Sequence, residues 1–125
     1  MSSSVIDHCK RYASNLTAVL ENQDWNNVEV LAHDIYRAWI EGKNLFLCGN
    51  GGSAGNAIHL ANDFLYGVGQ DLVPGIKVEA LSANPSVLTC LANDIGYDEI
   101  YSTQLAAKAS TGDVLVILSG SGNSP

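Results

Sequence analysis

The stretch Leu45-Phe-Leu-Cys-Gly-Asn-Gly-Gly-Ser53 decides the fold of this 125-residue chain. Its four leading apolar residues indicate a buried strand, and the glycine-rich segment that follows indicates a tight loop. The next residues, 54–66, have the three- and four-residue apolar spacing of a helix. A strand followed at once by a tight loop and a helix begins a βαβ unit, so the stretch predicts an α/β fold.

The same alternation continues toward the C-terminus. Strands are predicted at 76–81 and 114–118, with helical residues at 85–109 that are interrupted near Gly96. Strands that alternate with helices of this length predict right-handed crossovers and a parallel sheet covered on both faces. We therefore expect a three-layer α-β-α sandwich of Rossmann-like type.

Two amphipathic helices are predicted before this unit, at 4–21 and 25–41, with Ser4 or Ser3 as the cap of the first and Asp24 as the cap of the second. Their short connection predicts an αα-hairpin, whose large apolar faces favour self-association. The chain is accordingly divided into an N-terminal helical hairpin for oligomerisation (1–42) and an α/β domain (43–125). Because the sequence ends directly after a strand and loop, we expect the C-terminal part of that domain to be missing.

Composition narrows the function classes. Thirteen acidic against six basic residues give a net charge of −7, which disfavours binding to nucleic acid or to an anionic membrane. No run reaches the ~18 apolar residues of a membrane helix, and the N-terminus does not resemble a signal peptide, so a cytoplasmic protein is expected. Cys9, Cys48 and Cys90 are widely spaced and are predicted to be buried thiols.

Two loops follow strands of the predicted sheet, where ligands of parallel α/β folds bind. In the first, Gly51, Gly52 and Ser53 lie at a helix start, where backbone N–H groups favour an anion. The second, Ser119-Gly-Ser-Gly-Asn-Ser124, offers three hydroxyls. Together they predict a phosphate site of neutral donors, which an acidic protein can possess. The alternative is that each loop is only a tight turn.

The first loop also fits a dinucleotide fingerprint, Gly49-x-Gly51-x-x-Ala54. That fold needs an acidic residue at the end of the second strand, and here Glu79 lies inside the strand. A nicotinamide cofactor is therefore disfavoured.

Three further side chains are candidates for chemistry. His59 and Asp63 are four residues apart on one helix face, so they can share a metal ion or a proton; the alternative is a surface hydrogen-bonded pair. Asp94 is either a polar helix end or an acceptor for sugar hydroxyls.

At these motifs the sequence resembles the sugar isomerase (SIS) domain family, in its sedoheptulose 7-phosphate isomerase (phosphoheptose isomerase) branch. The resemblance covers the whole chain and rests on Cys48-Gly-Asn-Gly-Gly-Ser53, Ala57-Ile-His59-Leu-Ala61, Ala92-Asn-Asp94, Tyr97-Asp-Glu99, Gly112-Asp-Val-Leu115 and Ser119-Gly-Ser-Gly-Asn-Ser124. It implies a homotetramer formed through the N-terminal helices, with active sites near subunit interfaces. It also implies conversion of sedoheptulose 7-phosphate to a D-glycero-manno-heptose 7-phosphate, a step toward the heptose of bacterial lipopolysaccharide.

Site residues follow from the resemblance position by position. It implies phosphate contacts from Ser53, Ser119, Ser121 and Ser124 with the backbone between them, including Gly120, and substrate contacts from Asn50 and Asp94. His59 matches a zinc ligand, and Asp63 stands where the isomerases have a glutamate that is both zinc ligand and catalytic base. Asp63 is one methylene shorter than that glutamate, and the family's other zinc ligands and its histidine acid lie beyond residue 125.

A second class stays open, because the DnaA initiator-associating proteins resemble the same branch. They are tetrameric protein-binding modules without the full catalytic set, and the phrase Leu88-Thr-Cys-Leu-Ala-Asn-Asp94 is similar to both groups. The sequence thus predicts a phosphosugar isomerase, with a non-catalytic binding module as the alternative.

Overall fold

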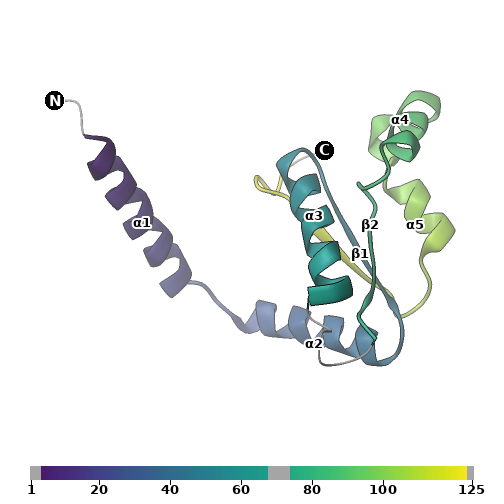
Figure 1. Cartoon of the computed structure of the whole chain (residues 1–125), viewed down its shortest axis with the longest axis horizontal. Helices are drawn as coiled ribbons and strands as arrows, with labels where there is room; N and C mark the ends of the chain where they lie inside the picture. The colour runs from purple at the N-terminus through teal and green to yellow at the C-terminus, as the bar shows by residue number, and fades with distance from the viewer. Residues whose placement is uncertain (1–3, 68–73, 124–125) are drawn as a thin grey trace. The chain divides into compact units, whose positions relative to one another are not determined.

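The computed structural model describes residues 4–67 and 74–123. The chain divides into two compact units, Met1–Ala32 and His33–Pro125. The first contains helix α1 (Val5–Glu21) and the first turns of α2 (Asn26–Ile40). The second contains the last turns of α2 and the whole sheet (Figure 1).

Helix α1 begins with a capping box. The Ser4 hydroxyl accepts the N–H of Asp7 (3.1 Å), and the Asp7 carboxylate accepts the N–H of Ser4 (3.3 Å). No residue of α1 is buried, so its apolar stripe lies at the surface, with Val5 80% and Val19 61% exposed. Both predicted helices are confirmed, whereas the hairpin of residues 1–42 stays a prediction.

The sheet is parallel in the order β2-β1-β3, as predicted. It consists of β1 (Asn44–Gly49), β2 (Lys77–Ala80) and β3 (Val114–Leu118) (Figure 1). Leu45 is in register with Val114, and Gly49 is in register with Leu118. The carboxyl ends of β1 and β3 are therefore level, and the loops that follow them start side by side.

The start of the same strand pair is held by Asp113. Its carboxylate accepts the N–H of Asn44 and the N–H of Ser110, each at 2.8 Å. These two bonds, with the Asn44 amide and the Lys43 ammonium, lower the pKa of Asp113 despite some desolvation.

Helices connect the strands and cover both faces. The first connection is α3 (Gly52–Asn62), which continues as a π-helix at Asp63–Gly67. The second contains α4 (Pro85–Asp94), a 3₁₀ turn at Tyr97–Glu99 and α5 (Ser102–Lys108). The predicted interruption near Gly96 is confirmed, since Gly96 has φ +122°. The predicted helical residues 54–66 are confirmed, and from Asp63 the backbone widens to π geometry.

The core has two parts, one on each face of the sheet. On one face, Leu45 and Leu47 pack with Ala57 of α3 and with Trp39 of α2. On the other face, Phe46, Cys48 and Leu81 pack with Tyr101 and Leu105 at α5. The predicted three-layer α-β-α sandwich is confirmed.

The three cysteines differ in exposure. Cys48 is buried as predicted, but Cys9 and Cys90 are exposed. The prediction is wrong for these two because Cys9 lies on the uncovered helix α1, and Cys90 faces solvent on α4 beside Asp94. Within the two described ranges, no helix is long and apolar enough to cross a membrane.

Candidate functional site

A cleft of about 410 Å³ lies at the carboxyl ends of β1 and β3. This volume is within the range of small-molecule sites. It is lined by residues from both predicted loops and from the start of α5: Cys48, Gly49, Asn50, Ser53, Tyr101, Ile117, Leu118, Ser119, Gly120 and Gly122. The two loops are therefore parts of one site.

The first loop is packed tightly around Gly49. A Cβ at this position would lie 2.7 Å from Ser53 Cβ and 2.8 Å from the Leu118 carbonyl oxygen. Only glycine allows the end of β1, the first turn of α3 and the end of β3 to approach so closely. Ser53 therefore lines the same cleft as Ser119 of the second loop.

Helix α3 starts at the cleft. Its N-cap is Gly51, which has φ +56° and no side chain to cap the helix. The Ser53 N–H donates to the Asn50 carbonyl (3.0 Å), which closes the loop into the first turn. A helix start without a capping side chain favours an anion through its N–H groups and its dipole.

In the second loop, two serine hydroxyls accept backbone N–H groups. Ser119 Oγ accepts from Gly122 (3.0 Å), and Ser121 Oγ accepts from Asn123 (3.2 Å). A hydroxyl group that accepts in this way still has its own hydrogen to donate. Both serines can thus donate hydrogen bonds while the backbone holds them in place.

In residues 4–67 and 74–123, none of those that line the cleft has a charged side chain at neutral pH. Burial raises the pKa of the Cys48 thiol. Burial, together with the neighbouring Cys48 and Tyr97, raises the pKa of Tyr101. Both groups are therefore protonated near neutrality, and the described lining of the cleft offers an anion neutral donors.

The structure brings together some of the predicted phosphate-binding residues. Asn50, Ser53, Ser119 and Gly120 line the cleft. The remaining predicted loop residues with described positions adjoin it without lining it: Gly51, Gly52 and Ser121. Ser124 lies outside the described residues.

The His59 and Asp63 pair is on α3 and its π-helical continuation. His59 Nε2 lies 3.5 Å from Asp63 Oδ2, and the two side chains are 76% and 48% exposed. Neither lines the cleft. The prediction that His59 and Asp63 share one helix face is confirmed, and the two side chains form an exposed pair.

These two side chains are too few for a structural zinc site, which takes four ligands, and they fall short of the three protein ligands of a catalytic site. No group of three or more His, Cys, Asp or Glu side chains that could hold a metal is present in residues 4–67 and 74–123. The described residues alone therefore do not fit a zinc ion.

Asp94 ends α4 and also lies outside the lining of the cleft. Its carboxylate accepts from the Asn93 amide (2.8 Å) and from the Cys90 thiol (3.3 Å). These bonds lower the pKa of Asp94, and the bond to the carboxylate raises the pKa of Cys90. Asp94 is thus an ionised acceptor at neutral pH.

Sequence reasoning missed part of the cleft wall. Tyr101 joins it from the start of α5, 52 residues from Gly49 in sequence. Nothing in the residues around Tyr101 indicates this position, because the contact is made only by the packing of α5 on the sheet. The sequence predicts Cys48, Ile117 and Leu118 only as strand residues, and in the structure these strand ends form part of the cleft wall.

Comparison with known proteins agrees with this geometry. The family model described as SIS domain matches residues 8–125. The chain belongs to the SIS domain family. Among curated SIS relatives, it is 43% identical over 98 residues to a phosphoheptose isomerase of Alteromonas mediterranea, a match that covers 78% of this chain and 49% of that protein. It is 38% identical over 118 residues to the phosphoheptose isomerase of Chlorobaculum parvum, which covers 91% and 55%.

Two solved structures of phosphoheptose isomerases have the same fold as this chain. The phosphoheptose isomerase of Neisseria gonorrhoeae superposes with a TM-score of 0.77 at 31% identity, and the match covers 94% of this chain and 61% of that one. A phosphoheptose isomerase from Francisella tularensis has the same fold, with a TM-score of 0.82 at 23% identity over 94% and 62%. The chain spans about half the length of the curated relatives it matches. It is thus a phosphoheptose isomerase-like SIS domain that corresponds to part of the length of its relatives.

Proposed function

We propose that the protein is a phosphosugar isomerase that interconverts sedoheptulose 7-phosphate and a D-glycero-manno-heptose 7-phosphate. One observation carries the proposal: both Ser/Gly loops line a single cleft that has neutral donors and an uncapped helix start. The similarity to phosphoheptose isomerases supports the choice of sugar.

In this proposal the cleft holds the phosphate group. Ser53 and Ser119 donate their hydroxyl hydrogens to it, with Ser121, Ser124 and the backbone around Gly51, Gly52 and Gly120 assisting. Asn50, at the mouth of the first loop, and Asp94 bind sugar hydroxyls. Phosphate held in this way fixes the position of the reacting carbons, which lie at the far end of the heptose.

The reaction then needs one base and one acid. A base removes a proton from C1 of the ketose and an acid protonates the C2 oxygen, which gives the enediol. The base then returns its proton to C2, and the C1 hydroxyl group gives its hydrogen back to the deprotonated acid, which leaves the C1 aldehyde of the aldose. We assign the base to Asp63, with His59 as its partner. The Asp63 carboxylate is half exposed and outside the cleft lining, so it must act at the part of the sugar that extends beyond the phosphate.

Zinc could bind at His59 and Asp63 only if further ligands complete the site. His59 and Asp63 supply two ligands, and the others must come from outside the described residues. A bound zinc ion would polarise the carbonyl group. Of the acid–base groups, this chain supplies the base, Asp63, and its partner, His59, while the histidine acid that the resemblance implies lies beyond residue 125.

We also propose a homotetramer formed through the N-terminal helices. The exposed apolar stripe of α1 supports it, because isolated helices with such a face are stabilised by packing against another surface. Light scattering on the purified chain should give four times the monomer mass. A monomer at micromolar concentration contradicts this part.

A second function, a phosphosugar-binding or protein-binding module without catalysis, is favoured by one specific observation. Asp63 is one methylene shorter than the glutamate of the isomerases, and it is an exposed partner of His59. In that case the cleft binds the phosphosugar and no isomerisation follows.

The two functions are separated by incubating the protein with sedoheptulose 7-phosphate, with and without Zn²⁺, and following the products by NMR. The isomerase predicts new anomeric signals of an aldose phosphate. Ketose that binds and stays unchanged supports the binding module instead.

A further inference from the structure

Among the described residues that line the cleft, Tyr101 has the only aromatic ring, and its hydroxyl group already makes a hydrogen bond. Its Oη donates to the Gly49 carbonyl at 2.6 Å. A phenol has one hydrogen to donate, so that hydrogen is not available to a ligand oxygen. Tyr101 therefore acts on the first loop, rather than as a phosphate donor.

The bond reaches the residue at which the site is most tightly packed. Gly49 lies against both Ser53 and Leu118. Because the peptide group is planar, holding the Gly49 carbonyl also fixes the direction of the Asn50 N–H. One hydroxyl group thus sets the orientation of the peptide with which the phosphate-binding loop begins.

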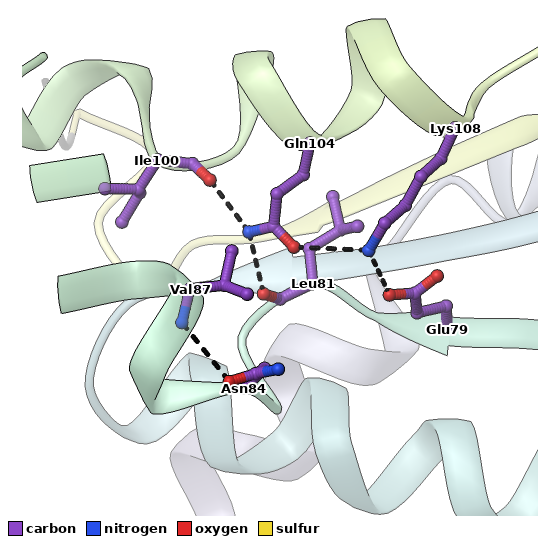
Figure 2. Close-up of polar contacts among 7 residues, drawn as sticks. All are labelled: Glu79, Leu81, Asn84, Val87, Ile100, Gln104 and Lys108. Carbon is purple, nitrogen blue, oxygen red and sulfur yellow. Dashed lines mark hydrogen bonds and ion pairs between the residues drawn. The ribbon is translucent and has the colours of Figure 1, made fainter. Parts of the chain in front are cut away.

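Tyr101 is itself held in place by apolar packing and by the hydrogen bonds of a neighbouring residue. Its ring packs on Phe46, Cys48 and Leu81. Three residues further on, the buried Gln104 amide donates to the carbonyl groups of Leu81 (3.1 Å) and Ile100 (2.8 Å), as Figure 2 shows. Two residues at the start of α5 therefore hydrogen-bond to the ends of adjacent strands. Gln104 donates to the carbonyl that follows β2, and Tyr101 donates to the carbonyl at the end of β1.

We propose that Tyr101 is a positioning residue of the phosphate site, which sets the Gly49 to Ser53 loop in its binding conformation through the Gly49 carbonyl. This inference rests on the proposed function only for the identity of the ligand. The raised pKa of Tyr101 agrees with it, since the hydroxyl group keeps its hydrogen throughout the neutral range.

The test compares Tyr101→Phe, which keeps the packed ring, with Tyr97→Phe, the same change on a tyrosine that is 61% exposed and outside the cleft lining. Each variant is titrated calorimetrically with sedoheptulose 7-phosphate, and thermal melting shows that it is folded. Tyr101→Phe should weaken binding about fivefold, the equivalent of one hydrogen bond, and Tyr97→Phe should leave it unchanged.

A double-mutant cycle with Ser53→Ala distinguishes a positioning role of Tyr101 from a merely structural one. If Tyr101 acts through the loop, its effect on affinity should fall to about twofold or less once Ser53 is removed, since contacts in one network are not additive. Equal affinity of Tyr101→Phe and wild type, or full additivity with Ser53→Ala, overturns the inference.

A ligand-free measurement keeps this inference distinct from the proposed function. In ¹H–¹⁵N NMR spectra of the unliganded chain, Tyr101→Phe should shift the amide signals of residues 50–53, and Tyr97→Phe should not. Wild-type chain that binds no sedoheptulose 7-phosphate contradicts the proposed function. Unshifted amide signals contradict the positioning role, whether or not the sugar binds.

Discussion

The backbone of Gly49 lies directly against the first turn of α3, so that a methyl group on Gly49 would come within 2.7 Å of Ser53 Cβ. The Leu118 carbonyl oxygen, at 2.8 Å from the same point, closes the other side. The two loops of the cleft therefore meet across a single glycine, and their spacing depends on it.

Gly49→Ala should accordingly separate the loops. The clash involves backbone atoms that cannot rotate away, so we expect loss of stability of about 2 kcal/mol and loss of phosphosugar binding. Gly55→Ala is the matched control, because a Cβ at Gly55 in α3 meets open space. That variant should gain about 0.5–1 kcal/mol from helix propensity. Urea unfolding measures both, and similar effects of the two substitutions contradict the packing described.

The length of the Asp63 side chain offers a test of catalysis. If Asp63 is the base, Asp63→Asn should abolish isomerisation. Asp63→Glu should change kcat by about tenfold or more, because a catalytic carboxylate is sensitive to displacements of about 1 Å. The control is Asp34→Glu, on an aspartate that pairs with Arg37 at 2.8 Å on α2. Full activity in Asp63→Asn rules out Asp63 as the base.

Acid should weaken the strand pair that Asp113 holds. Its pKa is lowered in the folded chain by the N–H groups of Asn44 and Ser110. The contribution of this carboxylate is therefore complete above its unfolded pKa of about 4, and is lost as the pH falls through the lower folded value.

Asp113→Asn should lower Tm by about 5 °C at pH 7 and by less at pH 3, since the wild-type carboxylate is then partly protonated. Asp98→Asn, on an exposed 3₁₀ turn, is the control. Melting curves at both pH values decide the point. A Tm difference between wild type and Asp113→Asn that grows on acidification contradicts the assigned role.

Local sequence was enough to predict the sheet and both loops. The apolar run before Gly49 and the run at 114–118 form parallel neighbours, and this arrangement alone brings Ser53 and Ser119 to one edge. The predicted zinc site, by contrast, stays a prediction, since the described residues give it only His59 and Asp63.

Other features depend on contacts between distant segments. Tyr101 reaches Gly49 across 52 residues, and α5 has to pack on the sheet before the contact exists. The π-helix from Asp63 to Gly67 is also not predictable, because the same apolar spacing suits an α-helix. Within it, the Phe64 carbonyl accepts the N–H of Ile76, twelve residues further along the chain. Long-range hydrogen bonds of this kind leave no periodic signal in the sequence.

The central claim is that both Ser/Gly loops hold one phosphate group, and calorimetric titration of the chain tests it most directly. Sedoheptulose 7-phosphate is compared with unphosphorylated sedoheptulose, on wild type, on Ser53→Ala with Ser119→Ala together, and on the control Ser14→Ala in the exposed helix α1. We predict binding that requires the phosphate, that weakens about 25-fold or more in the double variant, and that is unchanged in the control. Equal affinity for the two sugars, or a double variant that binds like wild type, contradicts the account.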